Sequence, residues 1–517
     1  MDSSQKAELI LYNIGAMIRF DKGPQADAVA IANGRILCLG KYTSTRAMSR
    51  PSTRLIDCQG YTLAPGFIDS HCHLLSLAAS ALSVDCTPSK ASSISDIQAA
   101  LKAKAQSTTP GAWIRGYGYD EFYLKEKRHP NRWDVDQAVH NQPVKLNHRS
   151  GHACVLNSTA LAALGITAQS EEPAGGVIER DLTTGEPTGL LLEMESHLEN
   201  LIPSLTYAEL AKGVRIINRR LLSYGITSVQ DATFTNSFSR WSLFSELKAS
   251  GILTPRTTVM PGVGFLDEFV QHGLTFGFGT GRLNIGHAKM MLTRTTGHVY
   301  PHEDELRNMA LKARNAGFPL AIHAVEAEAV ETAIRVIKSL RTHASGQNFR
   351  HRIEHCSECP PDSIARLREA KAIVVTQPGF LYYNGRRYLS EVAQNLQPHL
   401  YPIASMKKAG IVVAAGSDAP VAPENPIDGI YSAVTRRAST GQFISMQQGV
   451  SPIDAMRTYT LDGAYAASQE NYKGSIEEGK LADLILMTGN LLRTAHEELG
   501  KLKVALTILN GEVVWDG

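Results

Sequence analysis

The chain has 517 residues, more than the roughly 250–300 at which a single hydrophobic core stops growing, so we expect more than one structural unit. Hydrophobic residues make up 43% and charged residues 20% of the chain, which excludes a disordered chain, a collagen-like fibre and a coiled-coil rod. The formal net charge of +2 gives no electrostatic footprint for nucleic acid or for an anionic membrane.

The cellular setting is predicted from the apolar segments and the cysteines. Residues 1–6 are not followed by the apolar core of a signal peptide, and no run of about 18 or more apolar residues is present to span a bilayer. The seven cysteines are an odd number scattered through a long chain, which suits a reducing compartment better than a disulfide framework. We therefore predict a cytoplasmic protein.

The two ends of the chain have the pattern of short strands. Apolar runs at 28–32 and 36–39 flank Asn33-Gly34, and Asn510-Gly511 follows similar runs near the C-terminus. Asn-Gly between apolar runs is a strong hairpin signal, because both residues tolerate a positive φ. The sequence predicts a small β-domain built by residues 1–64 together with 470–517, around a middle unit of residues 65–469.

The middle unit alternates short apolar runs with amphipathic stretches, the pattern of β/α units around a parallel sheet. We expect helices over residues 304–316 and 326–340, and buried strands over residues 225–229, 285–290, 320–323, 352–355, 372–375 and 411–415. No Gly-rich phosphate fingerprint follows an early strand, so the pattern favours an α/β fold of the (β/α)8 barrel type over a doubly wound sheet.

Metal-binding side chains stand at the ends of several of these runs. His71 and His73 are two residues apart, so in a strand both imidazoles face the same side and can reach one ion. His323, His355 and Asp418 follow three later runs. In a parallel barrel all strand C-termini open on one face, so the set predicts a zinc-type centre. Each histidine alone is equally compatible with a core or surface role.

A sixth candidate is Lys289, which lies inside the apolar run 285–292. A lysine is expensive to bury unless it is paired or chemically altered. The alternative is a charge that reaches a solvated barrel mouth.

These residues, in this order, resemble the amidohydrolase superfamily of metal-dependent hydrolases, in particular its family-3 branch, which includes N-substituted formamide deformylase-like enzymes. The similarity spans nearly the whole chain. Its landmarks are Ala64-Pro65-Gly66-Phe67-Ile68-Asp69-Ser70-His71-Cys72-His73, Gly151-His152 with Asn157-Ser158, Gly189-Leu190-Leu191-Leu192-Glu193, Arg352-Ile353-Glu354-His355, Gly416-Ser417-Asp418-Ala419-Pro420-Val421 and Gly479-Lys480-Leu481-Ala482-Asp483.

The resemblance implies a (β/α)8 TIM barrel, a small β-sandwich domain formed by both chain termini, and an insertion after the first barrel strand at about residues 85–215. On the matching positions, it implies two metal ions. The first is bound by His71 and His73, the second by His323 and His355, and a carboxylated Lys289 bridges them. Asp418 binds metal and acts as the general base, and Glu193 is a rival bridging or substrate-facing carboxylate.

The activity implied by the resemblance is hydrolysis of a C–N bond in an amide or N-acyl small molecule, an N-formyl group included, with zinc as the expected metal. A zinc-type ion lowers the pKa of bound water to about 7, so that hydroxide is available at neutral pH. We expect Arg149 and His152 to line the substrate cleft, with ordinary fold-supporting roles as the alternative. The resemblance also suggests a homodimer.

Two departures from the branch leave the reaction type open. Residues 290–292 replace the Asp-Gly pair that usually follows the fourth-strand lysine, so the substrate does not carry over. His323 is followed three residues later by Glu326, which resembles the His-x-x-Glu of mononuclear deaminases, where the glutamate shuttles protons. Glu326 is thus the catalytic candidate of an alternative aminohydrolase, or simply an acid favoured at a helix start. A non-catalytic scaffold is disfavoured because all six ligand positions are occupied.

Overall fold

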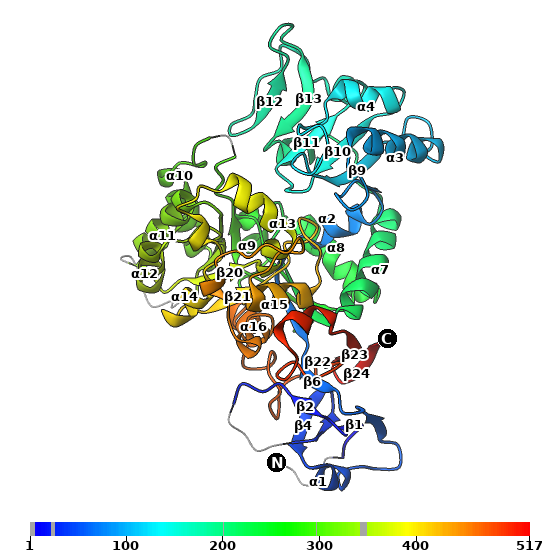
Figure 1. Ribbon diagram of the computed structural model, residues 1–517, viewed down its shortest axis with the longest axis vertical. Helices are drawn as coiled ribbons and strands as arrows, with labels where there is room; N and C mark the ends of the chain where they lie inside the picture. Colours follow the sequence, from blue (N-terminus) through cyan, green and yellow to red (C-terminus); the bar gives the residue numbers. More distant parts are fainter. Residues whose placement is uncertain (1–5, 22–25, 200, 296, 342–348) are drawn as a thin grey trace.

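The computed structural model describes residues 6–21, 26–199, 201–295, 297–341 and 349–517. The expectation about the N-terminal segment rested on residues 1–6, of which 1–5 lie outside the described residues. Three tiers follow one another along the long axis of the molecule in Figure 1: a sheet-bearing lobe, a central layer of helices around parallel strands, and a β-rich base with both termini.

Parallel strands form the centre of the molecule in two sheets. The first sheet contains β7 (Phe67–Cys72), β14 (Ile226–Asp231), β15 (Arg256–Val259) and β16 (Leu283–Ile285). The second contains β17 (Ala288–Met290), β18 (Leu320–Ala324), β19 (Arg352–His355), β20 (Ile373–Thr376) and β21 (Val413–Ala415). The prediction of a mixed α/β chain is confirmed, with strands at all six expected places.

One predicted strand differs, because residues 285–290 form two strands rather than one. The break falls at Gly286, where an added Cβ would lie 2.8 Å from the Thr258 side chain. Hydrogen bonding to the preceding strand nevertheless continues across the break, since Gly286 N donates to Val259 O and Lys289 N donates to Pro261 O. The kink therefore leaves Lys289 in line with the parallel strands.

Backbone hydrogen bonds also join β7 to the segment that follows β21. Asp418 N donates to His71 O at 2.7 Å, and His73 N donates to Ala419 O at 2.8 Å. Gly416 permits this approach, because an added Cβ would lie 2.5 Å from His71 N. The hydrogen-bonded neighbours thus run in a ring from β7 back to β7.

Amphipathic helices cover this ring. The helices of the central tier are α2 (Leu74–Ser80), α7 (Tyr207–Ser223), α8 (Phe238–Ala249), α9 (Leu266–Gln271), α10 (Glu303–Asn315), α11 (Ala327–Arg341), α12 (Pro361–Ala370), α13 (Pro378–Glu391), α14 (Ile403–Lys408), α15 (Pro426–Thr435), α16 (Pro452–Thr458) and α17 (Leu461–Ala466). Short 3-10 helices are η1 (Val263–Phe265), η2 (Gln397–His399), η3 (Met446–Gln448) and η4 (His496–Lys501). The two predicted helices are confirmed as α10 and α11, each within one residue of the expected ends.

The lobe is a six-stranded sheet with the order β12-β13-β11-β10-β9-β8. Its strands are β8 (Val84–Asp85), β9 (Ile114–Tyr119), β10 (Val144–His148), β11 (Ala153–Leu156), β12 (Val177–Arg180) and β13 (Pro187–Leu192), with helices α3 (Ile94–Gln106), α4 (Arg132–Ala138), α5 (Ser158–Leu164) and α6 (Glu195–Glu199). The expected insertion extended to about residue 215, but α7 already belongs to the central tier, since its Leu210 and Val214 pack into the core around the parallel strands.

Both chain ends build the base. One sheet has the order β4-β3-β1-β5 and the other the order β2-β6-β22-β23-β24, so the second combines strands from the two termini. The strands are β1 (Leu9–Tyr12), β2 (Ala16–Met17), β3 (Ala28–Ala32), β4 (Arg35–Gly40), β5 (Arg54–Asp57), β6 (Thr62–Pro65), β22 (Leu484–Met487), β23 (Val504–Leu509) and β24 (Glu512–Asp516), with helix α1 (Tyr42–Arg46). Leu9, Leu63, Leu484 and Ile508 share one apolar core between the sheets.

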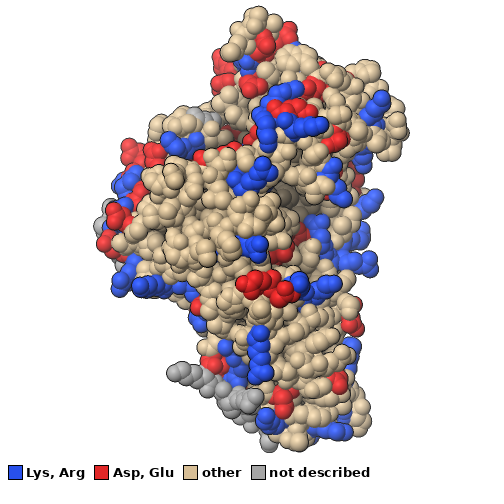
Figure 2. All heavy atoms as spheres, in the orientation of Figure 1, with Lys and Arg blue, Asp and Glu red and all other residues tan. Residues whose placement is uncertain are grey.

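The two Asn-Gly turns are where the sequence predicts them. Asn33 and Gly34 have φ of 50° and 71°, and Asn510 and Gly511 have φ of 54° and 80°, so all four adopt the positive values that such hairpins require. Lys and Arg are interspersed with Asp and Glu over the face in Figure 2. Among the described helices, none is both long and apolar enough to cross a bilayer.

Candidate metal centre

The C-terminal ends of the ring strands carry the predicted site. His71 stands near the end of β7, His323 in β18, His355 at the end of β19, and Asp418 three residues beyond β21. His71 is fully buried, and the other three are between 2% and 7% exposed. The fold therefore brings together four side chains that are far apart in the sequence.

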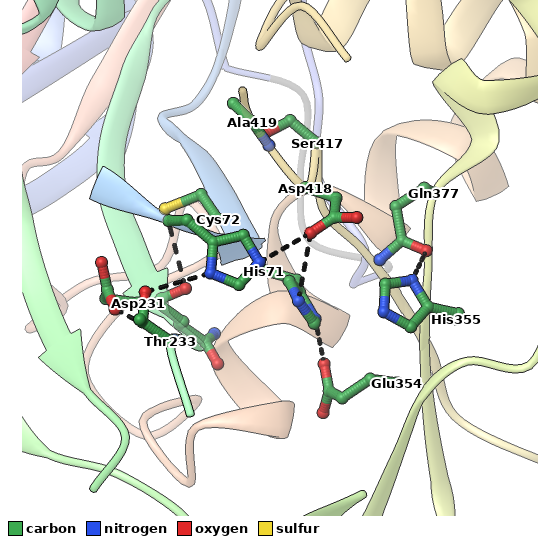
Figure 3. Close-up of polar contacts among 12 residues, drawn as sticks. His71, Cys72, Asp231, Thr233, Glu354, His355, Gln377, Ser417, Asp418 and Ala419 are labelled. Atoms are coloured by element: carbon green, nitrogen blue, oxygen red, sulfur yellow. Dashed lines mark hydrogen bonds and ion pairs between the residues drawn. The ribbon is translucent and has the colours of Figure 1, made fainter. Parts of the chain in front are cut away.

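Asp418 lies at the centre of this cluster (Figure 3). Its Oδ1 is 2.9 Å from His73 Nε2 and 3.3 Å from His71 Nε2. His71, His355 and Asp418 each offer one donor atom, and these three atoms lie within 4.8 Å of one another. The His323 and His355 ring centroids are 4.3 Å apart, which extends the cluster to the fourth histidine.

Three buried nitrogens of this cluster have no hydrogen-bond partner among the described residues: His71 Nε2, His355 Nε2 and Lys289 Nζ. An unsatisfied buried polar group costs about 1–3 kcal/mol, so three in one place need an explanation. Imidazole nitrogens and a carboxylate oxygen that converge on a common point are the donors that a divalent metal prefers. The residues present fit such an ion.

The ionisation of these groups suits metal binding. Burial lowers the pKa of His71 and His323 well below the usual value, and that of His355 to about 4, so the imidazoles are neutral. Burial raises the pKa of Asp418, but the adjacent histidines outweigh it and hold this pKa below its ordinary range. Burial lowers the pKa of Lys289 to about 8, which makes a neutral amine accessible.

A carboxylate behind the cluster orients His71. Glu354 Oε2 lies 2.5 Å from His71 Nδ1, and both side chains are inaccessible to solvent. Arg352 holds Glu354 with two guanidinium nitrogens and donates to Ser70 O at 2.6 Å. The carboxylate thus fixes the ring so that its Nε2 faces the centre, as carboxylate–histidine pairs do at metal sites. Glu354 was not among the residues predicted for the site, although an Arg and a Glu two apart in a buried strand indicate a shared polar face.

The other histidines are oriented by neutral groups. Gln377 Oε1 lies 2.8 Å from His355 Nδ1, and Thr233 Oγ1 lies 3.0 Å from His73 Nδ1. Neither Gln377 nor Thr233 was a candidate from sequence, because each lies on a different strand end from the histidine that it contacts. Each contact turns Nε2 of its histidine toward the cluster.

Two residues of the cluster and one of the lobe have a positive φ. His355 and Asp418 have φ of 70° and 59°, and Glu193, on the lobe, has φ of 54°. Non-glycine residues in this region are rare, and they gather at functional sites where the surrounding structure enforces them. At these positions the side chains point in directions that a residue with ordinary strand φ values would not give them.

The lobe contributes a His–Glu pair to the site. His152 Nδ1 is 3.0 Å from Glu193 Oε1, and the His152 ring centroid is 5.7 Å from that of His323. Burial lowers the pKa of His152, but Glu193 outweighs it, so the net pKa is raised. Burial raises the pKa of Glu193, but His152, with help from Thr295 and Thr293, outweighs it, so the net pKa is lowered. Both predicted residues therefore lie beside the histidine cluster.

The structure gives Arg149 a different surrounding from the one expected. Its guanidinium donates to Asp120 Oδ2 at 3.2 Å, to Asn384 Oδ1 on α13, and to Val421 O at 3.2 Å. Val421 N in turn donates to Asp418 O at 2.9 Å. Arg149 thus links the lobe to the turn that carries Asp418, and its engaged nitrogens favour the fold-supporting role over substrate contact.

Glu326 stands just before α11, the position that a helix-start acid occupies. Across the described part of the chain, its carboxylate forms no hydrogen bond or ion pair, and it acts on His152 only through its charge. A proton-shuttling role for Glu326 therefore has no contact with the cluster to support it.

A family model described as "Amidohydrolase family" matches residues 54–515. The chain belongs to the amidohydrolase family. This confirms the resemblance drawn from the motifs. Among amidohydrolase relatives, the N-substituted formamide deformylase of Arthrobacter pascens is 28% identical over 98% of each chain. The putative amidohydrolase YtcJ of Bacillus subtilis is 26% identical over 96% of this chain and 97% of its own.

A solved structure shares the fold. An uncharacterized metal-dependent hydrolase from Pyrococcus horikoshii superposes with a TM-score of 0.76 at 23% identity, covering 95% of this chain and 99% of its own. At that identity the likeness establishes the amidohydrolase fold and no more.

Proposed function

We propose that this amidohydrolase is a metal-dependent hydrolase that cleaves the C–N bond of an amide or N-acyl small molecule, N-formyl compounds included. The observation that carries the proposal is the convergence of His71, His355 and Asp418, with their donor atoms within 4.8 Å of one another. Family membership and the likeness to an N-substituted formamide deformylase support the choice of bond.

The architecture that we propose for this function is a (β/α)8 barrel made by the ring of strands. A β-sandwich of residues 1–64 with 470–517 forms its base, and the sheet-bearing lobe is an insertion after β7. In such a barrel the C-terminal strand ends form the catalytic face. A cytoplasmic homodimer that binds neither nucleic acid nor membrane completes the proposal.

We assign the metal ligands as two groups with a bridge. His71 and His73 would hold one ion and His323 and His355 a second, with Lys289, carboxylated on Nζ, as a ligand available to both. The buried, unpartnered Nζ and its pKa of about 8 support this assignment, because a neutral amine is the form that adds to carbon dioxide. Zinc suits the nitrogen-rich donor set.

The bound metal supplies an activated water at neutral pH and charge stabilisation for the substrate carbonyl oxygen. Asp418 is ionised, so it can accept the proton of the attacking water and return it to the leaving nitrogen. His152, held by Glu193 and with its pKa raised, is suited to donate a hydrogen bond to the carbonyl oxygen.

Metal content and hydrolysis test this proposal together. Protein purified without chelators is analysed for metal per chain by plasma mass spectrometry, and amine release is followed with a panel of N-formyl and N-acetyl amines. Asp418→Asn should abolish turnover, whereas Asp304→Asn on the exposed start of α10 should leave it unchanged.

The outcomes separate the alternatives. Two ions per chain with amine release support the amide hydrolase. One ion, with ammonia release that depends on Glu326, replaces it by the aminohydrolase. A chain that takes up no metal and keeps its activity after Asp418→Asn overturns both.

A further inference from the structure

A basic hollow of about 530 Å³ lies at the opposite end of the strand ring from the metal centre. Arg256 begins β15 and Arg282 directly precedes β16, so both mark the N-terminal ends of parallel strands, whereas His71 and Asp418 mark the C-terminal ends. The hollow is completed from the base of the molecule, by Arg35 of β4 and by the C-terminal segment, with Tyr472 and Asn510.

Only one of the three arginines of the hollow is neutralised. Arg256 donates from Nε and Nη2 to the two oxygens of Asp483, at 2.6 and 3.0 Å. Arg35 donates to the carbonyl of Gly479 at 2.7 Å. Within the described ranges of the chain, neither Arg35 nor Arg282 forms an ion pair, and both are exposed. Two guanidinium groups therefore face the hollow with unused donors.

Two lysines near the hollow have a lowered pKa, because burial and the neighbouring positive charges disfavour their protonated form. Lys473 is 4% exposed, and its Nζ lies 2.9 Å from Ser228 Oγ. Burial and the charge of Arg256 lower the pKa of Lys473 to about 7, against the opposing effect of Asp483. Burial, Arg256, Arg282 and Lys473 all lower the pKa of Lys248.

The carboxylates of the same C-terminal segment are engaged elsewhere. Glu470 pairs with Arg350 at 2.8 Å, and Glu477 pairs with Lys480 at 3.0 Å. Among the contacts of the described residues, Asp483 is thus the one carboxylate that pairs with an arginine lining the hollow.

We propose that this hollow binds a small oxyanion with two negative charges, either inorganic phosphate or the phosphate group of a phosphomonoester. The guanidinium groups of Arg35 and Arg282 clamp its oxygens, because the planar fork of an arginine matches phosphate geometry. Asn510 and Tyr472 also line the hollow, and both are uncharged. The site is separate from the metal centre and does not depend on the proposed reaction.

Calorimetric titration of the metal-containing protein with inorganic phosphate, at ionic strength held constant with sodium chloride, tests the site. We expect saturable binding with one ion per chain. Arg35→Gln and Arg282→Gln should each weaken it about tenfold, the effect of losing one charge-assisted contact. Arg215→Gln, on the exposed face of α7, is the matched control and should bind as the unmodified chain does.

The metal centre could also take up phosphate, and the variants distinguish the two places. Binding that is unchanged in both Arg35→Gln and Arg282→Gln places the ion at the metal and overturns the proposal. Absence of saturable binding overturns it as well. Phosphomonoesters that bind more tightly than phosphate, with the same loss in both variants, would identify the ester as the ligand.

Discussion

Replacement of Glu354 by glutamine tests the idea that the metal centre depends on a carboxylate that never touches the metal. The substitution keeps the shape of the side chain but removes its charge. Burial raises the pKa of Glu354, yet Arg352 and Lys289 outweigh it and lower the net pKa, so the native side chain is ionised. Glu354 Oε2 lies 2.5 Å from His71 Nδ1 and 2.9 Å from Arg352 Nη2.

Two effects of Glu354→Gln follow from these distances. Arg352 keeps its contacts to Ser70 O and Gln230, but its buried charge loses its counter-charge, and breaking such a pair costs about 3–5 kcal/mol. His71 exchanges a charged acceptor for a weaker neutral one, and changes of this kind behind a metal ligand weaken metal binding about 10–100-fold. We therefore expect a large fall in the free energy of unfolding and a weaker metal site.

Urea unfolding gives the stability, and competition with a chromogenic chelator gives the metal affinity. Glu305→Gln on the exposed face of α10 is the matched control and should change neither. Because the pKa of Glu354 is lowered in the folded chain, its ionised form stabilises the fold at pH values above the ordinary pKa of a glutamate. This stabilisation is lost as the pH falls to the pKa of Glu354 in the folded chain. Glu354→Gln should flatten that acid limb. If metal affinity and stability both stay at the native level, the reasoning is refuted.

Three further changes test other parts of the structure. Lys473 has a folded pKa of about 7 against an ordinary value of about 10.4, so the unfolded chain binds more protons between these pH values and stability should rise with pH there. The free energy of unfolding should rise by about 1 kcal/mol per pH unit in the native chain, and Lys473→Met should abolish this rise. Urea titrations at pH 7 and pH 9 measure it, and an equal rise in the variant would contradict the prediction. Gly416→Ala should lower stability by about 1–3 kcal/mol in the same assay, because its Cβ would lie 2.5 Å from His71 N. Arg149→Met should speed amide hydrogen exchange in residues 418–421 and at the start of β11, because the contact between Arg149 and Val421 O is lost. Unchanged protection at both places would disprove this prediction.

Local rules allowed several features to be read from the sequence. The turns at Asn33-Gly34 and Asn510-Gly511 were predictable because the φ values that they need belong to individual residues. The strand runs ending near His71, His323 and His355 were predictable because parallel strands present their C-terminal ends on one face. The family motifs then indicated that these residues belong to one site, which no local rule predicts.

Only the tertiary structure decided which of these residues meet. Glu354 and His71 are 283 positions apart, and their 2.5 Å contact depends on how neighbouring strands place their side chains. Arg149 was a candidate for the substrate cleft because it lies close to the Gly151-His152 motif in the sequence. In the structure its guanidinium donates to Asn384 and Val421, which belong to distant segments. The residue types of the candidate metal centre, and the strands that carry them, followed from the sequence. Packing between distant segments determined their directions, because no short stretch of chain contains both partners of these contacts.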